Sequence, residues 1–119
     1  MHIKPGQRMG LFNAPDNVLD LTGELPEDVA VIEELQGRQV DIILGFIENR
    51  NMLETHLPVL RRALDDEGAL WVAYYKGSAS IDTDINRDSI HDYAKSIDLK
   101  GVAMVSIDEN WSGFRFKKV

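Results

Sequence analysis

Two stretches of the chain carry apolar side chains at almost every position and lack the alternation of a half-exposed strand. They run from Val40 to Ile47 and from Ala69 to Tyr75. Apolar side chains on both faces are typical of strands buried inside a parallel sheet. The pattern therefore predicts two central parallel strands, and parallel neighbours need a crossover connection between them.

The segment between these strands has the spacing of an amphipathic helix. We predict a crossover helix over Asn51 to Asp66. Its apolar face consists of Leu53, Leu57, Leu60 and Leu64, and its polar face of Arg61, Arg62 and Asp65.

The ends of this helix are predicted from local residues. Asn51 followed by Glu54 has the spacing of a capping box. Pro58 removes a mid-helix hydrogen bond, so we expect a kink or a later start. Gly68 is expected to end the helix in a left-handed cap or turn.

The order of strand, helix and strand recurs toward the C-terminus. A helix is expected up to Gly101, with Ile90, Tyr93, Ala94 and Ile97 on one face. A strand over Val102 to Ile107 and a turn over Asp108 to Asn110 follow. Trp111 to Phe116 alternates as a half-exposed edge strand does, so the chain is predicted to close in a β-hairpin.

The front of the chain is less regular. Arg8 to Phe12 and Val29 to Ile32 are interpreted as strands, and Pro15 to Leu21 as a short helix closed by Gly23. With about six strands and three helices, right-handed crossovers place helices on both faces of the sheet. We therefore predict one Rossmann-like α/β domain over residues 1–119, a three-layer sandwich whose mostly parallel sheet ends in an antiparallel hairpin.

Composition narrows the functions that this domain can have. The 119 residues carry a formal net charge of -7 and no cysteine, which excludes disulfides and thiol nucleophiles. The negative field disfavours binding to nucleic acid, because the only basic clusters are Arg61-Arg62 and Lys117-Lys118. Apolar runs are far shorter than the roughly 18 residues of a membrane span. The first residues lack an apolar signal segment, so we expect a cytoplasmic protein without membrane contact.

Two resemblances follow from particular segments. The segments from Leu57 to Leu64 and from Gly68 to Val72 look like the later half of class I methyltransferases, in which a closing antiparallel hairpin is a hallmark. About the last two-thirds of the chain also resembles a family of small uncharacterised bacterial proteins of unknown function, through Leu70 to Lys76, Asp84, Arg87-Asp88 and Asp108 to Phe116. The resemblance implies a methyltransferase-like fold and brings no established activity.

The methyltransferase resemblance also raises the question of adenosylmethionine. In that class a glycine-rich turn after the first strand lets backbone amides approach the ligand. Here the corresponding place reads Asn13-Ala14-Pro15, while the acidic residue expected after the second strand is available as Glu33 or Glu34. The acidic residue is therefore available but the glycine-rich turn is missing. We expect no cofactor and keep adenosylmethionine as the alternative.

A ligand crevice in an open α/β sheet lies beyond the carboxyl ends of the strands, where the chain order reverses. Here that point is between the first strand and the strand at Val40. The candidate lining is Asn13, Ala14, Pro15, Glu48, Asn49 and Arg50. The competing structural interpretation is that Asn13 and Asn49 cap helices and Arg50 pairs with a carboxylate.

Three further side chains are candidates for contact with a ligand or partner. Lys76 and Arg87 are a candidate anion-binding pair, unless Lys76 is solvated and Arg87 pairs with Asp84 or Asp88. Trp111 is a candidate aromatic contact, unless its ring lies over the sheet edge with the indole nitrogen hydrogen-bonded.

No metal site is expected. Asp82, Asp84 and Asn86 alternate as in an EF-hand loop, but Arg87 and Tyr93 stand where that loop needs glycine and glutamate. Asp84 or Asn86 as a helix N-cap explains the run better. The histidines, which are His2, His56 and His91, lack paired zinc spacing.

Three functional hypotheses follow. The first is a non-catalytic, methyltransferase-like domain that binds a protein or a small ligand through a degenerate crevice or elsewhere. The alternative is an adenosylmethionine-dependent methyltransferase or another small-ligand enzyme, with Lys76, Arg87 and Trp111 around an anionic or aromatic substrate. The third is a homodimer that pairs through the edge of the C-terminal hairpin, which carries Phe114 and Phe116.

Overall fold

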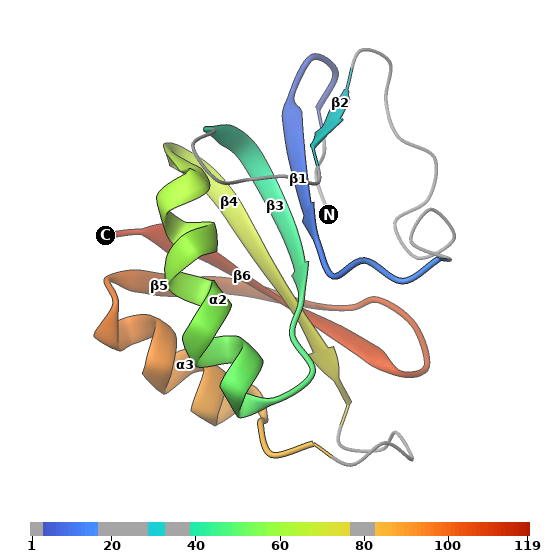
Figure 1. The fold of residues 1–119 in the computed structure, drawn as a ribbon, viewed down its shortest axis with the longest axis vertical. Helices are drawn as coiled ribbons and strands as arrows, with labels where there is room; N and C mark the ends of the chain where they lie inside the picture. The colour runs from blue at the N-terminus through green and yellow to red at the C-terminus, as the bar shows by residue number, and fades with distance from the viewer. Residues whose placement is uncertain (1–3, 17–28, 33–38, 77–82) are drawn as a thin grey trace.

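The computed structural model describes residues 4–16, 29–32, 39–76 and 83–119. In these residues six strands form one sheet in the order β2-β1-β3-β4-β6-β5 (Figure 1). The strands are β1 Arg8–Phe12, β2 Ala30–Ile32, β3 Val40–Phe46, β4 Leu64–Tyr75, β5 Leu99–Ser106 and β6 Trp111–Lys118. The helices are α2 Arg50–Ala63 and α3 Arg87–Ser96.

The sheet is mixed, as the sequence predicts. β1 to β4 pair in parallel, and β6 runs antiparallel to both β4 and β5. The chain order reverses at β1, which has β2 on one side and β3 on the other. Phe12 pairs with Gly45 and Phe46 with Ala73, so the carboxyl ends of β1, β3 and β4 lie at one edge of the sheet.

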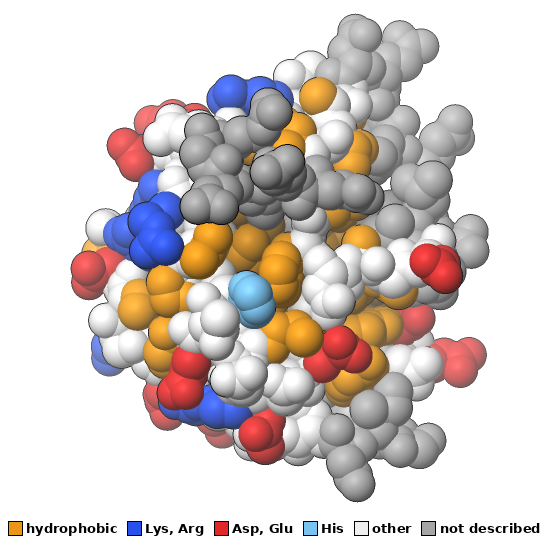
Figure 2. Space-filling model, viewed as in Figure 1, with side chains coloured by type: hydrophobic (Ala, Val, Ile, Leu, Met, Phe, Trp, Pro, Cys, Tyr) orange, Lys and Arg blue, Asp and Glu red, His pale blue; other side chains and the backbone are white. Residues whose placement is uncertain are grey.

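Both faces of the sheet carry buried apolar side chains. The described helices, α2 and α3, lie together on one face (Figure 1), and in Figure 2 apolar side chains show in the middle of that face with charged ones toward the rim. The opposite face has its own cluster, formed by Met9, Leu11, Ile42, Leu44, Phe46, Trp71 and Ala73. The helix expected over Pro15 to Leu21 falls mostly outside the described residues, so the third layer stays a prediction.

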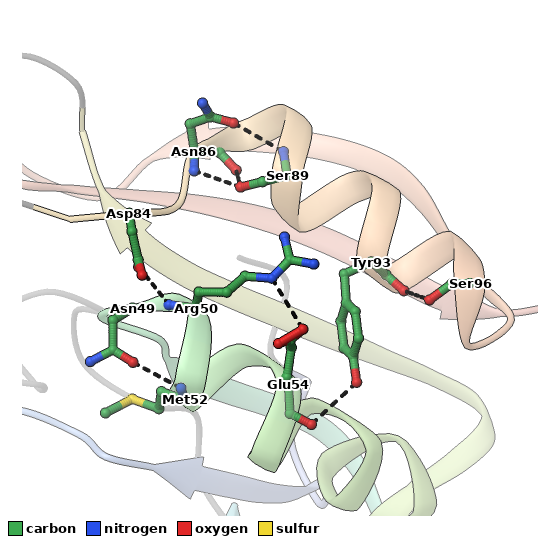
Figure 3. Close-up of polar contacts among 9 residues, drawn as sticks. All are labelled: Asn49, Arg50, Met52, Glu54, Asp84, Asn86, Ser89, Tyr93 and Ser96. Atoms are coloured by element: carbon green, nitrogen blue, oxygen red, sulfur yellow. Dashed lines mark hydrogen bonds and ion pairs between the residues drawn. The ribbon is translucent and has the colours of Figure 1, made fainter.

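α2 departs from the prediction at both ends, since it ends at Ala63 and the residues from Leu64 to Asp66 already belong to β4. It begins at Arg50, and Asn49 is the N-cap in place of Asn51, because the Asn49 side chain accepts a 2.8 Å hydrogen bond from the Met52 amide. Pro58 does not delay the start and lies inside the helix. It leaves the carbonyl of Glu54 without its helical donor, and the Tyr93 hydroxyl of α3 donates to that oxygen at 3.2 Å (Figure 3).

Two glycines predicted to end helices lie in strands instead. Gly68 belongs to β4, where a side chain would come within 2.7 Å of the Asp41 carbonyl oxygen. Gly101 belongs to β5, where a side chain would come within 2.5 Å of the Phe114 ring. Both positions need glycine for close approach rather than for a turn. α3 ends at Ser96, and Asp98 takes the left-handed conformation with φ of 62°.

We predict that Asp98→Gly raises the free energy of unfolding by about 0.5–1 kcal/mol, because glycine adopts this conformation without a Cβ penalty. The change also removes a negative charge from the C-terminal end of α3, where the helix dipole makes negative charge unfavourable. Urea unfolding measures the difference. Asp92→Gly inside α3 is the control and should lower stability slightly, by about 0.3 kcal/mol, because glycine is a poorer helix former than aspartate. A loss at Asp98 would contradict the proposed backbone cost.

The prediction that Trp111 to Phe116 forms an edge strand is wrong. β6 lies between β4 and β5, so the hairpin does form the edge of the sheet but through β5. Phe114 and Phe116 point into the core, with 8% and 0% of their surfaces exposed. Either strand of a hairpin can be the outer one, and the alternation of apolar and polar residues along each strand is the same in both arrangements. The sequence pattern therefore does not reveal which strand is outermost.

Candidate functional site

Three polar side chains meet at the carboxyl ends of β1, β3 and β4. Asn13 follows β1, Glu48 lies two residues beyond β3, and Tyr75 ends β4. One carboxylate oxygen of Glu48 accepts from the Asn13 amide at 3.0 Å, and the other accepts from the Tyr75 hydroxyl at 2.8 Å. We call Asn13, Glu48 and Tyr75 the Glu48 cluster, and both of its carboxylate oxygens are engaged within the protein.

Asn13 spans the gap between β1 and β3. Its backbone is left-handed, with φ of 54°, a conformation that asparagine tolerates better than most residues. The same side-chain nitrogen donates to the Phe46 carbonyl oxygen at 3.0 Å and lies 3.6 Å from the Met52 sulfur. The amide of Asn13 therefore ties the end of β1 to the end of β3, whereas the sequence made it a candidate crevice residue, with a helix cap as the competing structural interpretation.

The loop and hairpin around the Glu48 cluster add further contacts. The Thr83 hydroxyl donates to the Glu48 backbone oxygen at 2.7 Å. Trp111, the first residue of β6, stacks on the Tyr75 ring with centroids 4.2 Å apart. It also meets the edge of the Phe46 ring at 4.9 Å. Trp111 thus lies over the strand ends and buttresses Tyr75, and it is only partly exposed.

Asn49 and Arg50 serve the start of α2 (Figure 3). Asn49 caps the helix, and the Arg50 amide donates to the Asp84 carboxylate at 2.6 Å. The Arg50 guanidinium pairs with Glu54 at 3.4 Å and lies 5.7 Å from the centre of the Tyr93 ring. These contacts join α2 to α3 and its preceding loop, and they match the structural interpretation of both residues.

Lys76 and Arg87 have different partners. The Lys76 ammonium donates to the Ser106 hydroxyl on β5, and Arg87 pairs with its neighbour Asp88 at 3.4 Å. Asn86 is the N-cap of α3, in a reciprocal capping box with Ser89. The anion-binding pair therefore stays a prediction without a shared contact in the structure.

A shallow hollow lies beside Asn13. Its volume is about 250 Å³, and the described residues that line it are Leu11, Phe12, Asn13 and Ala14. Pro15 follows this lining and is partly buried. The hollow is below the roughly 300–1,000 Å³ of ordinary ligand pockets. Glu33 and Glu34, the candidates for a ribose contact, lie outside the described residues.

The hydroxyl of Tyr75 titrates above its ordinary range. Burial raises its pKa above 10.0, and the hydrogen bond to Glu48 and the charge of that carboxylate raise it further. The folded state therefore holds this proton more tightly than the unfolded state. The resulting stability is fully present below the unfolded pKa and is lost as the pH rises through the folded pKa.

We predict that the wild-type protein loses more stability than Tyr75→Phe between about pH 9 and pH 11, because only the wild type must release this proton on ionisation. Urea unfolding at several pH values measures the two slopes. The neighbouring Tyr74 also has a raised pKa, mainly through burial, but it is present in both proteins. Equal slopes would show that the Tyr75 hydroxyl is not held by Glu48.

Metal ligands do not gather in the described residues, where no group of three or more histidine or acidic side chains is placed to hold an ion. His56 packs on Phe12 with ring centroids 4.6 Å apart, and His91 stacks on Phe114 at 5.8 Å. Within the described ranges, no helix is both long and apolar enough to cross a membrane.

The strand order, the reversal at β1 and the antiparallel closing strand define the fold of class I methyltransferases. Solved structures agree over almost the whole chain. Ribosomal protein L11 methylase from Lactobacillus delbrueckii subsp. bulgaricus is 11% identical with a TM-score of 0.63, over 98% of this chain and 71% of that one. Fibrillarin from Methanococcus jannaschii, a pre-rRNA processing protein, is 15% identical with a TM-score of 0.58, over 99% and 69%.

A third structure, the fibrillarin/Nop5p complex, is similar over 100% of this chain and 76% of the other, with 13% identity and a TM-score of 0.53. At such identities the likeness establishes the fold alone. No protein-family model matches the sequence, and neither does any curated protein. The methyltransferase-like fold expected from the sequence is thus confirmed.

The fold class implies adenosylmethionine, but the described residues do not fit it. The place of the glycine turn is taken by Asn13, whose side chain crosses from β1 to β3. The carboxylate of Glu48 already accepts from two side chains of the protein, which hold it between Asn13 and Tyr75. We derive no chemical step through this cofactor.

Sequence reasoning selected Asn13 and Glu48 as crevice residues but missed Tyr75 and Thr83. Tyr75 was interpreted only as the end of a strand. A parallel register places the last residues of neighbouring strands at one edge, so a tyrosine there was a usable indication. Thr83 follows a part of the chain whose length and composition do not predict its path.

Proposed function

We propose that this protein is a non-catalytic, methyltransferase-like cytoplasmic domain that acts by binding another protein, with its cofactor crevice held closed. The Glu48 cluster carries the proposal. Each oxygen of the Glu48 carboxylate accepts from a side chain of the protein, one from Asn13 and the other from Tyr75, and these bonds fix its orientation. The cluster ties together three strand ends of the sheet.

Two further observations support a protein partner. The formal net charge of -7 disfavours a phosphate backbone as the partner. One of the structurally similar chains was solved as a fibrillarin/Nop5p complex, so a chain of this fold forms a complex with another protein. The edge strand β5 offers a surface away from the crevice for such contact.

A thermal-shift titration tests the closed crevice. A ligand at a hundredfold excess over its dissociation constant stabilises the native state by about 2.7 kcal/mol. We expect no saturable shift with adenosylmethionine, adenosylhomocysteine or a nucleotide panel. A saturable shift with either methionine derivative would contradict the proposal and make a methyltransferase the working model.

The second candidate is a small-ligand enzyme that uses the hollow beside Asn13. The partly exposed Trp111 favours it, because the part of its ring that Tyr75 does not cover could stack on an aromatic ligand. Nucleotides or aromatic acids that quench the tryptophan fluorescence would favour this enzyme. The quenching should be lost in Trp111→Phe, in which the emission of Trp71 is unchanged. Absence of quenching would remove it.

A further inference from the structure

The outer edge of the sheet is formed by β5. It pairs with β6 on one side, and in the described part of the chain no strand pairs with its other side. An edge strand presents unpaired backbone amides and carbonyls, which can accept another strand. A register shift between Gly101 and Ala103 bends β5, so a partner must follow an irregular edge.

A groove lies where α3 meets the start of β5. It encloses about 360 Å³ and is lined by His91, Lys95, Asp98, Leu99, Lys100 and Val119. Leu99 provides a buried apolar side chain, with 1% of its surface exposed. Figure 1 shows α3 beside β5 at the margin of the molecule. An edge strand next to a helix-lined groove is the arrangement in which strand addition binds extended peptides.

Apolar surface gathers at the same place. Among the described residues only four large hydrophobic side chains are strongly exposed, and three of them are here. Val102 and Met104 on β5 are 42% and 43% exposed, and Val119 beside the groove is 81% exposed. Exposed apolar side chains along an edge strand mark a contact surface.

The charges around the groove are mostly basic, although the protein as a whole is acidic. Lys95 and Lys100 line it, together with the acidic Asp98. In the described ranges neither of these two ammonium groups lies within ion-pair distance of a carboxylate. Lys95 and Lys100 would therefore attract carboxylates of a partner, whereas Asp98 in the same lining would repel them.

We propose that β5 and this groove bind an extended acidic segment of a partner protein by strand addition. An apolar side chain of that segment fills the groove above Leu99, and its flanking carboxylates approach Lys95 and Lys100. A second copy of this chain is a poorer occupant, because β5 contains no acidic residue to offer to these lysines. The inference rests on the proposed function and names the chemistry of its partner.

Fluorescence anisotropy tests the proposal with a labelled peptide in which Val-Thr-Val is flanked by glutamates on both sides. We expect saturable binding that weakens as salt is raised. The double variant Lys95→Glu with Lys100→Glu should lower the affinity at least about tenfold, since it reverses the groove charge. Lys4→Glu with Arg62→Glu is the matched control, because both side chains are exposed and the net charge changes equally.

Two modified peptides separate strand addition from simple charge attraction. Methylation of alternate backbone nitrogens removes donors and should abolish binding, and a lysine-flanked version should not bind. Equal binding of the methylated peptide, or an equal loss in the control variant, would overturn the proposal. So would sedimentation showing a dimer that the groove variant dissociates, because the occupant would then be a second copy. None of these results depends on the adenosylmethionine titration, so the two proposals fail separately.

Discussion

Phe116→Ala is expected to lower the free energy of unfolding by about 3–5 kcal/mol, the range for a fully buried phenylalanine. The Phe116 side chain has no exposed surface and stacks on Phe114 with ring centroids 4.4 Å apart. Its strand is enclosed on both sides, since Phe116 pairs with Leu70 on β4 and with Gly101 on β5. Gly101 leaves no side chain to fill the cavity.

Urea unfolding of both proteins measures this loss. Lys117→Ala, at the exposed neighbouring position of β6, is the control and should change stability by less than about 0.5 kcal/mol. A loss below about 1 kcal/mol at Phe116 would mean that the ring is half in water, as expected for an outer strand. The position of β6 between β4 and β5 would then be wrong.

Glu48→Ala is expected to lower the free energy of unfolding by about 2–3 kcal/mol, because it leaves the partly buried Tyr75 hydroxyl and one Asn13 contact without their acceptor. The direction of the change separates two roles. A carboxylate held for catalysis in an unfavourable setting commonly stabilises the protein when it is removed. Removal of a carboxylate that joins three strand ends instead destabilises the protein.

Thermal and urea unfolding of Glu48→Ala decide between these roles. Glu109→Ala is the control, because Glu109 is exposed in the β5–β6 turn and the described residues offer it no hydrogen bond or ion pair. The control should be neutral within about 0.5 kcal/mol. A rise in stability on removal of Glu48 would favour the enzyme interpretation.

Much of the fold follows from patterns that burial imposes. β3 and β4 were predictable because both of their faces are apolar, and α2 because its leucines recur at helical spacing. Their bounds were less predictable. Pro58 is tolerated inside α2 through the Tyr93 hydroxyl, a contact across 39 positions of the chain. Local rules do not contain such compensation.

The roles of two glycines were also predicted wrongly. Gly68 and Gly101 were assigned to helix ends, since glycine commonly adopts left-handed turns there. In the structure they let backbone or rings approach closely, while Asp98 takes the left-handed position after α3. The sequence does not separate these two uses of glycine, because the difference lies in a neighbour that is distant along the chain.

The candidate site was partly predictable for a simple reason. Asn13 and Glu48 follow strands that a Rossmann-like order makes neighbours, so their meeting required only the strand ends. That they bond to each other and to Tyr75, rather than facing a ligand, depends on side-chain directions and on the left-handed backbone of Asn13. Neither is visible in residue spacing.

A double-mutant cycle between Glu48 and Tyr75 tests the closed crevice most directly. The unfolding free energies of the wild type, Glu48→Ala, Tyr75→Phe and the double variant give the coupling of the two side chains. The bond of 2.8 Å between them predicts a favourable coupling of about 1–2 kcal/mol. A coupling near zero would show that the carboxylate is not committed to Tyr75, and Glu48 would then be free to serve a ligand.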